Sequence, residues 1–366
     1  MANSIKPRPF AKHLTLESCE RYTDTWLQPL TTCRMSTSLH SFAKINLGLK
    51  IGPRRLDGFH ELRTIYQTIA LHDVVRVDVL AGSGIEIQCT EPAVPLDESN
   101  TCYKMAERVM KEAKAQGRVV IHIEKQLPVQ GGLGAASSNA IVTMLGLERE
   151  LGLKLAPDDK LRIAAGVGSD LPLFLVGGTV LGVGRGEEVY ALQDLPNLHL
   201  VVVTPTIGVS TPVAFARWDE WAAREAELTH SGATGTINTF SNLVFRWLSE
   251  SLPWQNLATG GPASGVPAGS GDRAETLLLD LVRAGIENDF ERVVFPEYPE
   301  LHEVKRVLKR EGACYASLSG SGSTLYGLFT SAEEAEGAAS RMRAAGHAAI
   351  VTTTVTRQRY WELLFR

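Results

Sequence analysis

The glycine-rich segment from Val129 to Leu147, VQGGLGAASSNAIVTMLGL, constrains the fold most, because it passes directly into an apolar stretch. Ala140, Met144 and Leu147 follow at intervals of four and three residues, which predicts a helix that begins just after the glycines. Backbone N–H groups at a helix start lack helical acceptors, and the helix dipole makes that end positive. The segment therefore predicts a loop and helix start that can bind an anion such as phosphate.

This loop differs from better-known phosphate loops. No Lys-Ser or Lys-Thr pair follows its glycines, so it is not a P-loop. The run Gly132-Leu133-Gly134 lacks the third glycine of a dinucleotide-binding fingerprint. Taken by itself, the loop is also compatible with a purely structural turn before a helix. The hydroxyls of Ser137 and Ser138 favour a site, since hydroxyls at a helix start can bind phosphate or a metal-bound water.

The composition excludes several classes of function. The 366 residues are 44% hydrophobic and 21% charged, with a formal net charge of −4, which is typical of a soluble protein of two domains. The mild acidity and the lack of a basic stripe argue against nucleic acid as the main partner. The five cysteines form no CxxC pair, which disfavours a zinc or redox site. Their odd number, the lack of a recognisable signal peptide and the lack of an apolar run of about 18 residues predict a cytoplasmic protein that does not enter a membrane.

The first half of the chain mixes strands and helices. Residues 1–36 show little periodicity, and Met35 is as good a candidate for the true start as Met1. Residues 37–196 form a predicted N-terminal nucleotide-binding domain. Its predicted strands lie at 41–51, 61–71, 73–81 and 119–125, and a further pair of strands lies within 173–192. Its predicted helices lie at 100–117, in the segment directly after the glycine loop, and at 157–168. The inward face of the first helix is predicted to carry Tyr103, Ala106, Val109 and Met110.

The second half is predicted to form a substrate domain over residues 197–355. It begins with a buried strand at 197–205 and ends in the order helix, strand, strand, helix, strand, which is typical of a ferredoxin-like domain. A Gly/Ala/Pro/Ser-rich insertion interrupts it at 256–273, and residues 356–366 form a C-terminal extension. Because strands and helices mix without a regular βα repeat, the sequence predicts an α+β fold.

Two further motifs carry polar residues in apolar surroundings. In AKINLGL, strand alternation places Lys44 and Asn46 on one face, although a lone lysine in a strand is more often a solvated edge residue. In GVGSDLPLFL, Asp170 stands between small residues and an apolar run, although a lone aspartate there is more often a helix cap or turn residue. Neither motif is specific by itself, but their joint presence with the glycine loop is.

These segments together resemble a known family. The stretches SFAKINLGLKI, DGFHEL, LPVQGGLGAASSNA, VGSDLPLFL and SLSGSGSTLYGLF are similar to the GHMP kinase superfamily, from about Ser41 to Phe329 with an interruption at 219–274. DGFH resembles the branch that phosphorylates the 2-hydroxyl of a cytidine-diphosphate-linked methylerythritol, on the methylerythritol phosphate route to isoprenoid precursors. The resemblance implies an ATP-dependent small-molecule kinase with an N-terminal ribosomal-protein-S5-like domain and a C-terminal ferredoxin-like domain.

The resemblance also implies a role for each matching residue. Asp170 would be the general base towards the substrate hydroxyl, and Lys44 would lie beside it. The glycine loop would bind the triphosphate of ATP, with Mg²⁺ neutralising charge and no direct metal ligand predicted. The predicted ATP-binding residues are Asn100, Lys125, Gly131, Gly132, Leu133, Gly134, Ala135, Ala136, Ser137, Ser138 and Asn139. The predicted substrate-binding residues are Asn46, Phe59, His60, Thr211, Pro212, Phe215, Gly320, Ser321 and Gly322, with Phe59 and Phe215 flanking the cytosine and His60 reading its edge.

The sequence departs from the family in two places, and other functions stay open. Ala135 and Ala136 stand where the family usually has glycines, which puts the ATP affinity in question because alanine resists positive φ. Phe59 replaces the more usual tyrosine. A mevalonate or homoserine kinase of the same superfamily is one alternative, which DGFH disfavours. A catalytically inactive binding protein of this fold is the other, which the presence of both Lys44 and Asp170 disfavours. The sequence leaves open whether the protein is a monomer or a homodimer.

Overall fold

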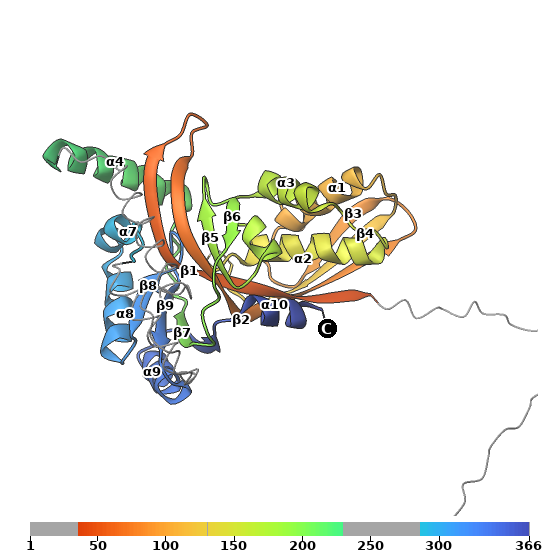
Figure 1. The fold of residues 1–366 in the computed structure, drawn as a ribbon. Helices are drawn as coiled ribbons and strands as arrows, with labels where there is room; N and C mark the ends of the chain where they lie inside the picture. Colours follow the sequence, from red (N-terminus) through yellow and green to blue (C-terminus); the bar gives the residue numbers. More distant parts are fainter. Residues whose placement is uncertain (1–35, 130, 230–285, 366) are drawn as a thin grey trace, which may run out of the picture. The chain divides into compact units, whose positions relative to one another are not determined.

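The computed structural model describes residues 36–129, 131–229 and 286–365, which contain two β-sheets with helices packed on each (Figure 1). The first sheet consists of β1 (Thr37–Arg54), β2 (His60–Leu80), β3 (Gly84–Cys89), β4 (Arg118–Glu124), β5 (Thr179–Val183) and β6 (Glu188–Ala191). The second consists of β7 (His199–Val203), β8 (Tyr315–Leu318), β9 (Leu325–Phe329) and β10 (Ala349–Thr353). Residues 1–35 and the predicted insertion at 256–273 lie outside the described residues.

The hairpin of β1 and β2 is the longest element of the fold. The sequence predicts two strands at 61–71 and 73–81, but β2 is a single strand that pairs with β1 from Arg54↔His60 to Thr37↔Val77. The first half of β2 also pairs with β5, and its second half pairs with β4. Because β1 pairs with β2 on both sides of residue 72, β2 continues as one strand through the position where the sequence predicts a break. Two irregularities in β1, between Phe42 and Ala43 and between Asn46 and Gly48, bracket Lys44.

Three helices cover the first sheet: α1 (Thr101–Glu112), α2 (Ala135–Glu150) and α3 (Pro157–Val167). Helix α2 lies on β1 and β2 and is covered on its other side by α1, which also reaches β3 (Figure 1). This position explains why α2 is buried around most of its circumference. On α1 the residues that reach the core are Cys102, Met105, Ala106 and Val109; the predicted inward residues Tyr103 and Met110 are only half-buried, so the predicted face was slightly rotated.

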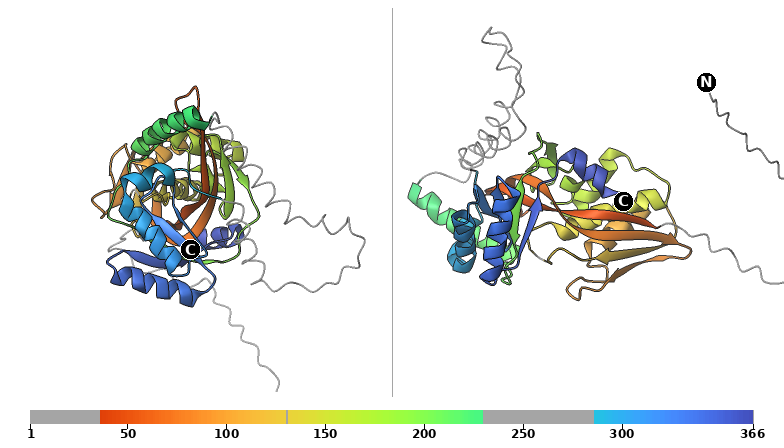
Figure 2. Two further views of the ribbon diagram at one scale, coloured as in Figure 1. Left: turned by 90° about the vertical axis from the view of Figure 1, so that its left-hand side faces the viewer. Right: turned by 90° about the horizontal axis from the view of Figure 1, so that it is seen from below.

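The second sheet has the strand order β10-β7-β9-β8, and its elements follow the order predicted for a ferredoxin-like domain. Its helices are α4 (Thr211–Thr229), α7 (Glu291–Glu297), α8 (Pro299–Arg310) and α9 (Ala332–Ala344), of which α4 is not predicted from the sequence. Figure 2 shows α7, α8 and α9 on the face of this sheet that is turned away from β1 and β2. Strand alternation explains the two cores: Val201 and Val203 pack towards the helices, and Leu200 and Val202 pack towards β1 and β2.

The described residues from Ser36 to Phe365 form one compact unit. A shared core cluster joins Ile45 and Ile65 of the first sheet to Leu200 and Tyr326 of the second. The domain boundary predicted between residues 196 and 197 falls between β6 and β7, where the chain passes from one sheet to the other.

Three further elements differ from the sequence prediction. The segment after Asp170 is a one-turn 3₁₀ helix, η1 (Pro172–Leu175), and not the start of a strand, because Pro172 favours the first position of a helix. β3 is not predicted. The extension beyond residue 356 contains a helix, α10 (Arg357–Leu364), which lies along β1 and places Tyr360 and Leu364 in the main core (Figure 1).

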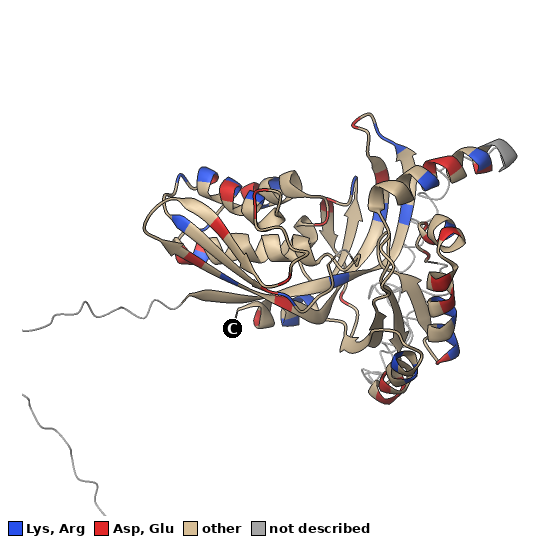
Figure 3. Ribbon diagram, turned by 180° about the vertical axis from the view of Figure 1, so that it is seen from behind, with Lys and Arg blue, Asp and Glu red and all other residues tan. Residues whose placement is uncertain are grey.

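The surface of the described residues carries charges of both signs, which occur together on α4 and α8 (Figure 3). No helix in the ranges 36–129, 131–229 and 286–365 combines the length and the apolar character needed to cross a membrane.

Candidate active site

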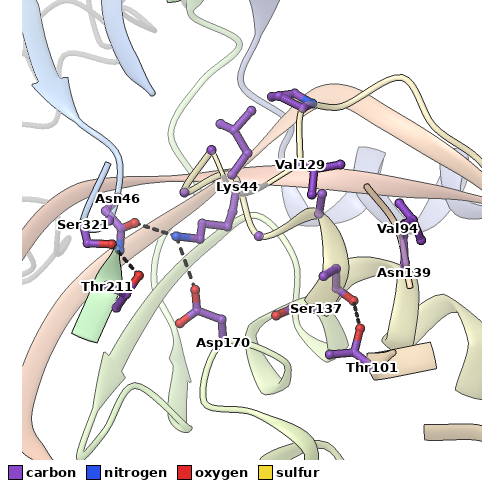
Figure 4. A pocket seen from close by; sticks show the side chains of 18 of the residues that line it. Lys44, Asn46, Val94, Thr101, Val129, Ser137, Asn139, Asp170, Thr211 and Ser321 are labelled. Atoms are coloured by element: carbon purple, nitrogen blue, oxygen red, sulfur yellow. Dashed lines mark hydrogen bonds and ion pairs between the residues drawn. The ribbon is translucent and has the colours of Figure 1, made fainter. Parts of the chain in front are cut away.

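A cavity of about 510 Å³ brings together the glycine loop, the start of α2, the Lys44 motif and the Asp170 motif (Figure 4). The predicted site residues that line it are Lys44, Asn46, Asn100, Lys125, Gly131, Gly132, Leu133, Gly134, Ala135, Ala136, Ser137, Asn139, Asp170, Thr211, Phe215, Gly320 and Ser321. The predicted site residues outside its lining are Phe59, His60, Ser138, Pro212 and Gly322. Segments from both sheets therefore meet at one cavity, as a two-substrate enzyme requires.

Lys44 and Asp170 form an ion pair at this cavity. Lys44 Nζ lies 3.3 Å from Asp170 Oδ2 and donates to Asn46 Oδ1 at 2.7 Å (Figure 4). Asn46 in turn donates to Thr64 Oγ1 at 2.7 Å on β2, which fixes the amide. The Lys44 side chain is 3% exposed and that of Asp170 is 37% exposed. The buried lysine is thus held by two partners, whereas the carboxylate remains open to a molecule in the cavity.

Tyr66 of β2 provides a second contact to the carboxylate. Its hydroxyl donates to Asp170 Oδ1 at 3.0 Å, so each carboxylate oxygen has one partner. Burial, reinforced by the negative charge of Asp170, raises the pKa of the Tyr66 phenol well above its usual value near 10. Tyr66 therefore remains a hydrogen-bond donor at neutral pH. Nothing in the sequence singles out this residue beyond its place in an alternating strand.

The glycine loop has the backbone geometry that its composition predicts. Gly132 and Gly134 have φ of +77° and +69°, and Gly134 is the residue before the first turn of α2. A second glycine turn, Gly320 to Ser323, lies between β8 and β9. A Cβ on Gly132 would lie 2.3 Å from the carbonyl oxygen of Ser319, directly before this turn, so the glycine loop contacts the second glycine turn closely. Among the described residues Lys114 is the only non-glycine with positive φ, so Ala135 and Ala136 occupy helix positions that alanine adopts without strain.

A buried carboxylate that the sequence analysis missed, Asp73, connects the loop to the sheet. It accepts hydrogen bonds from Lys125 Nζ at 2.5 Å, from the backbone N–H groups of Gln126 and Leu127 at 2.8 Å, and from Asn139 Nδ2 at 3.0 Å. These donors stand on both sides of the glycine loop. Asp73 therefore fixes both ends of the loop. Its strand also carries polar residues such as His72, Arg76 and Asp78, so the sequence holds no signal that sets Asp73 apart.

The two serines of the loop face different surroundings. Ser137 lines the cavity, whereas Ser138 is fully buried and its hydroxyl has no hydrogen-bond partner. The helical turn separates them, since neighbouring residues on a helix point about 100° apart. Only Ser137 is placed to contact a molecule in the cavity. Asn139 also lines the cavity, and its Oδ1 has no hydrogen-bond partner.

The far end of the cavity is formed by the start of α4 and the second glycine turn. Thr211 Oγ1 and Ser321 Oγ are 2.7 Å apart and link these two segments (Figure 4). Asn288 holds the turn from behind by donating to the carbonyl oxygens of Leu318 and Gly320. The hydroxyl pair gives this end of the cavity a polar wall, and Asn288 fixes the turn behind it.

The aromatic residues of the DGFH motif make contacts that differ from the predicted arrangement. His60 stacks on Phe215, with ring centroids 4.9 Å apart, and its Nε2 lies 2.6 Å from Asp219 Oδ1. Phe59 is 51% exposed, and the guanidinium of Arg185 lies over its ring at 5.0 Å. The long hairpin thus brings His60, and not Phe59, against Phe215. That Phe59 and Phe215 flank one base stays a prediction.

Two family descriptions match the chain. Residues 100–178 match the GHMP kinases N terminal domain, and residues 273–348 match the GHMP kinases C terminal domain. Named relatives match over most of their length. The 4-diphosphocytidyl-2-C-methyl-D-erythritol kinase of Solibacter usitatus is 37% identical over 299 residues, covering 81% of this chain and 83% of the relative. The enzyme of that name from Acaryochloris marina is 32% identical, covering 84% of this chain and 92% of the relative.

Solved structures agree. The crystal structure of a 4-(cytidine 5'-diphospho)-2C-methyl-D-erythritol kinase is 28% identical with a TM-score of 0.62, covering 87% of this chain and 98% of that one. A homoserine kinase from Cytophaga hutchinsonii has a TM-score of 0.64 at 19% identity, covering 91% of this chain and 98% of that one. At that identity the likeness concerns the fold alone.

Proposed function

The chain belongs to the 4-diphosphocytidyl-2-C-methyl-D-erythritol kinase family of the GHMP kinases, and from this membership we propose that it transfers the γ-phosphoryl group of ATP to the 2-hydroxyl of 4-diphosphocytidyl-2-C-methyl-D-erythritol. The observation that carries the proposal is the Lys44–Asp170 pair in one cavity with the glycine loop. A carboxylate base beside an anion-binding helix start is what phosphoryl transfer to an alcohol requires.

The residues of the cavity fit a nucleoside triphosphate. The volume of about 510 Å³ lies in the range of small-molecule sites, which runs from roughly 300 to 1,000 Å³. The loop from Gly131 to Gly134 has no side chains larger than leucine, so its backbone can approach phosphate oxygens, and α2 begins directly after it. Lys125 lines the same cavity and adds a positive charge, which Asp73 holds in place.

In the proposed reaction Asp170 accepts the proton of the substrate hydroxyl as the oxygen attacks the γ-phosphorus. The bond between the γ-phosphorus and the β,γ-bridging oxygen breaks, and ADP leaves with that electron pair. Tyr66 and Lys44 each occupy one oxygen of the carboxylate and so fix its plane. Lys44 also supplies a positive charge beside the attacking oxygen, where negative charge accumulates during transfer. The loop N–H groups orient the phosphates, and with a loose transition state such positioning accounts for most of the rate.

Mg²⁺ bound to the triphosphate would neutralise charge on the transferring group. Asp170 is the one carboxylate among the cavity-lining residues of the described chain, and no group of three His, Cys, Asp or Glu there could hold a metal ion. This donor set fits Mg²⁺, which keeps several waters and binds through one or two protein groups plus the phosphates. Ser137 would contribute its hydroxyl from the protein, because the Asp170 carboxylate is engaged by Lys44 and Tyr66 and takes the substrate proton.

On the substrate side, the stacked pair of His60 and Phe215 supports a role in binding the cytosine. Phe215 lines the cavity, and Asp219 orients the imidazole behind it. A nucleobase bound there would rest on a rigid aromatic platform. Phe59, at the exposed tip of the hairpin with Arg185 over its ring, would close on the base from outside.

A substrate panel tests the proposal. The purified protein is given ATP and Mg²⁺ with 4-diphosphocytidyl-2-C-methyl-D-erythritol, mevalonate or homoserine, and ADP formation is measured. We expect turnover with the first compound alone, and a kcat about a hundredfold lower from the Asp170→Asn variant. Preference for mevalonate or homoserine would move the protein to another branch of the superfamily. ATP binding without turnover on any of the three would favour the inactive binding protein.

A further inference from the structure

The C-terminal helix α10 touches the turn that carries Asp170, although it is about 190 residues away in the sequence. Tyr360 Oη donates to the carbonyl oxygen of Phe174 at 2.7 Å, and Trp361 Nε1 donates to that of Val176 at 3.1 Å. Both acceptors stand at the end of η1, the single 3₁₀ turn that follows Asp170. Terminal carbonyls of a helix have no helical donor, so α10 supplies the donors that this short turn lacks.

The packing between α10 and this turn is tight. A Cβ on Gly177 would lie 2.4 Å from Tyr360 Cδ1, so the ring rests directly on the glycine backbone. Tyr360 is fully buried, and Trp361 packs against the same core cluster. The contact therefore holds the end of η1 by two hydrogen bonds and by direct steric fit.

Further hydrogen bonds fix α10 and the segment before it. The backbone N–H of Arg357 donates to Asp194 Oδ2 at 2.8 Å, and its guanidinium donates to the carbonyls of Thr179 and Leu192 at the start of β5 and the end of β6. Just before the helix, the Val355 carbonyl accepts from Gln67 Nε2 at 2.9 Å. Gln67 adjoins Tyr66, whose hydroxyl contacts Asp170. The helix is thus attached to both segments that hold the carboxylate.

The other side of η1 faces the centre of the site. Phe174 N–H donates to the Leu171 carbonyl at 3.0 Å, which closes the turn immediately after Asp170. A Cβ on Gly134 would lie 3.0 Å from both Phe174 Cζ and Lys44 Cγ. The turn is therefore packed between the glycine loop and α10. A shift of Phe174 away from α10 would move the Asp170 backbone relative to Lys44.

We propose that Tyr360 and Trp361 are positioning residues for phosphoryl transfer, which hold the Asp170 turn at the distance from Lys44 that the reaction requires. The proposal rests on the proposed function, since it assigns Asp170 a part in the reaction. It gives a task to the C-terminal extension, for which the sequence suggested none. Misplacing a reacting group by about 1 Å can cost roughly a hundredfold in rate.

The test uses Tyr360→Phe, alone and with Trp361→Phe, in the full chain. Tyr360→Phe removes one hydroxyl and keeps the ring against Gly177. We expect kcat to fall about tenfold for Tyr360→Phe and up to about a hundredfold for the double variant, with the KM for ATP and for the alcohol within about twofold of the parent. Gln358→Ala is the control, because this exposed side chain on the same helix bonds only to Glu362. We expect it to keep the parent kcat.

Two readouts separate positioning from mere loss of stability. Amide hydrogen exchange should accelerate at Leu171 to Val176 in Tyr360→Phe and not in Gln358→Ala, whatever the activity. In an Asp170→Asn background, Tyr360→Phe should cause no further loss of kcat, because its effect passes through the missing carboxylate. A kcat of Tyr360→Phe within twofold of an active parent, or an equal proportional loss in the Asp170→Asn background, overturns the proposal. A parent without kinase activity would instead refute the proposed function.

Discussion

Replacing Asp170 by asparagine tests the centre of the proposed mechanism. Asparagine has nearly the same shape and retains one acceptor oxygen, but it cannot take a proton and carries no charge to face Lys44. General base catalysis is typically worth about 10²- to 10⁴-fold in rate. Because phosphoryl transfer has a loose transition state that asks little of the base, we expect kcat to fall by about a hundredfold. The KM for ATP should change little, since the glycine loop is untouched.

The same substitution has a predictable effect on stability. Breaking a fully buried ion pair costs about 3–5 kcal/mol, and breaking an exposed one costs about 0–1 kcal/mol. Here the carboxylate side chain is 37% exposed, and Lys44 keeps its hydrogen bond to Asn46. These two facts place the expected loss at about 1–2 kcal/mol, between the two limits. The protein should therefore stay folded, with a Tm lower by a few degrees.

Asp159→Asn is the matched control. Its carboxylate is 38% exposed and pairs with Arg162 at 2.8 Å on the surface of α3, so the chemical change and the exposure are nearly the same. Steady-state kinetics with varied ATP, together with thermal unfolding, should show a normal kcat for Asp159→Asn and a large loss for Asp170→Asn. Turnover of Asp170→Asn at the parent rate would refute the assignment of the base.

Three further predictions concern the surroundings of the site. Asp73→Asn should lower the free energy of unfolding by about 3 kcal/mol or more in chemical denaturation, because it leaves Lys125 without its buried counter-charge. A loss below about 1 kcal/mol would contradict this prediction. Ala135→Gly and Ala136→Gly should leave the KM for ATP nearly unchanged, since both residues already have helical backbone. Each substitution should cost about 0.5–1 kcal/mol in stability, and a markedly lower KM for ATP would show that the alanines do restrict the loop. Phe59→Ala should raise the KM for the cytidine substrate by roughly ten- to a hundredfold, because base stacking is worth about 1–3 kcal/mol. Phe59→Tyr should be close to neutral, and an unchanged KM in Phe59→Ala would remove Phe59 from the substrate site.

The sequence contained the parts of the site that depend on local chemistry. The glycines of the loop have positive φ where the composition predicts a turn, and α2 begins directly after Gly134. The family resemblance selected Lys44 and Asp170, which the fold brings to 3.3 Å. The loop conformation can be predicted because glycine is the residue that adopts positive φ without strain. Lys44 and Asp170 can be predicted because their motifs occur together with the glycine loop.

Long-range partners could not be predicted in this way. Asp73 reads as one more residue of a strand until the fold places the amides of Gln126 and Leu127 against it. His60, next to Phe59 in the motif, is the ring that meets Phe215, because helix α4 packs over the hairpin. Neither contact leaves a periodicity in the sequence, since each joins residues whose separation depends on the path of the whole chain.

The C-terminal helix shows the same limit most clearly. From the sequence alone, RQRYWELLFR is an extension without an assigned role, because its pattern is too short to indicate which surface it would meet. Only the tertiary structure places Tyr360 against Gly177 and Phe174, at the back of the turn that carries Asp170. Local sequence determined which groups could perform the chemistry. Packing between distant segments decided how those groups are held, because distance and orientation arise from the whole fold and not from any single stretch of it.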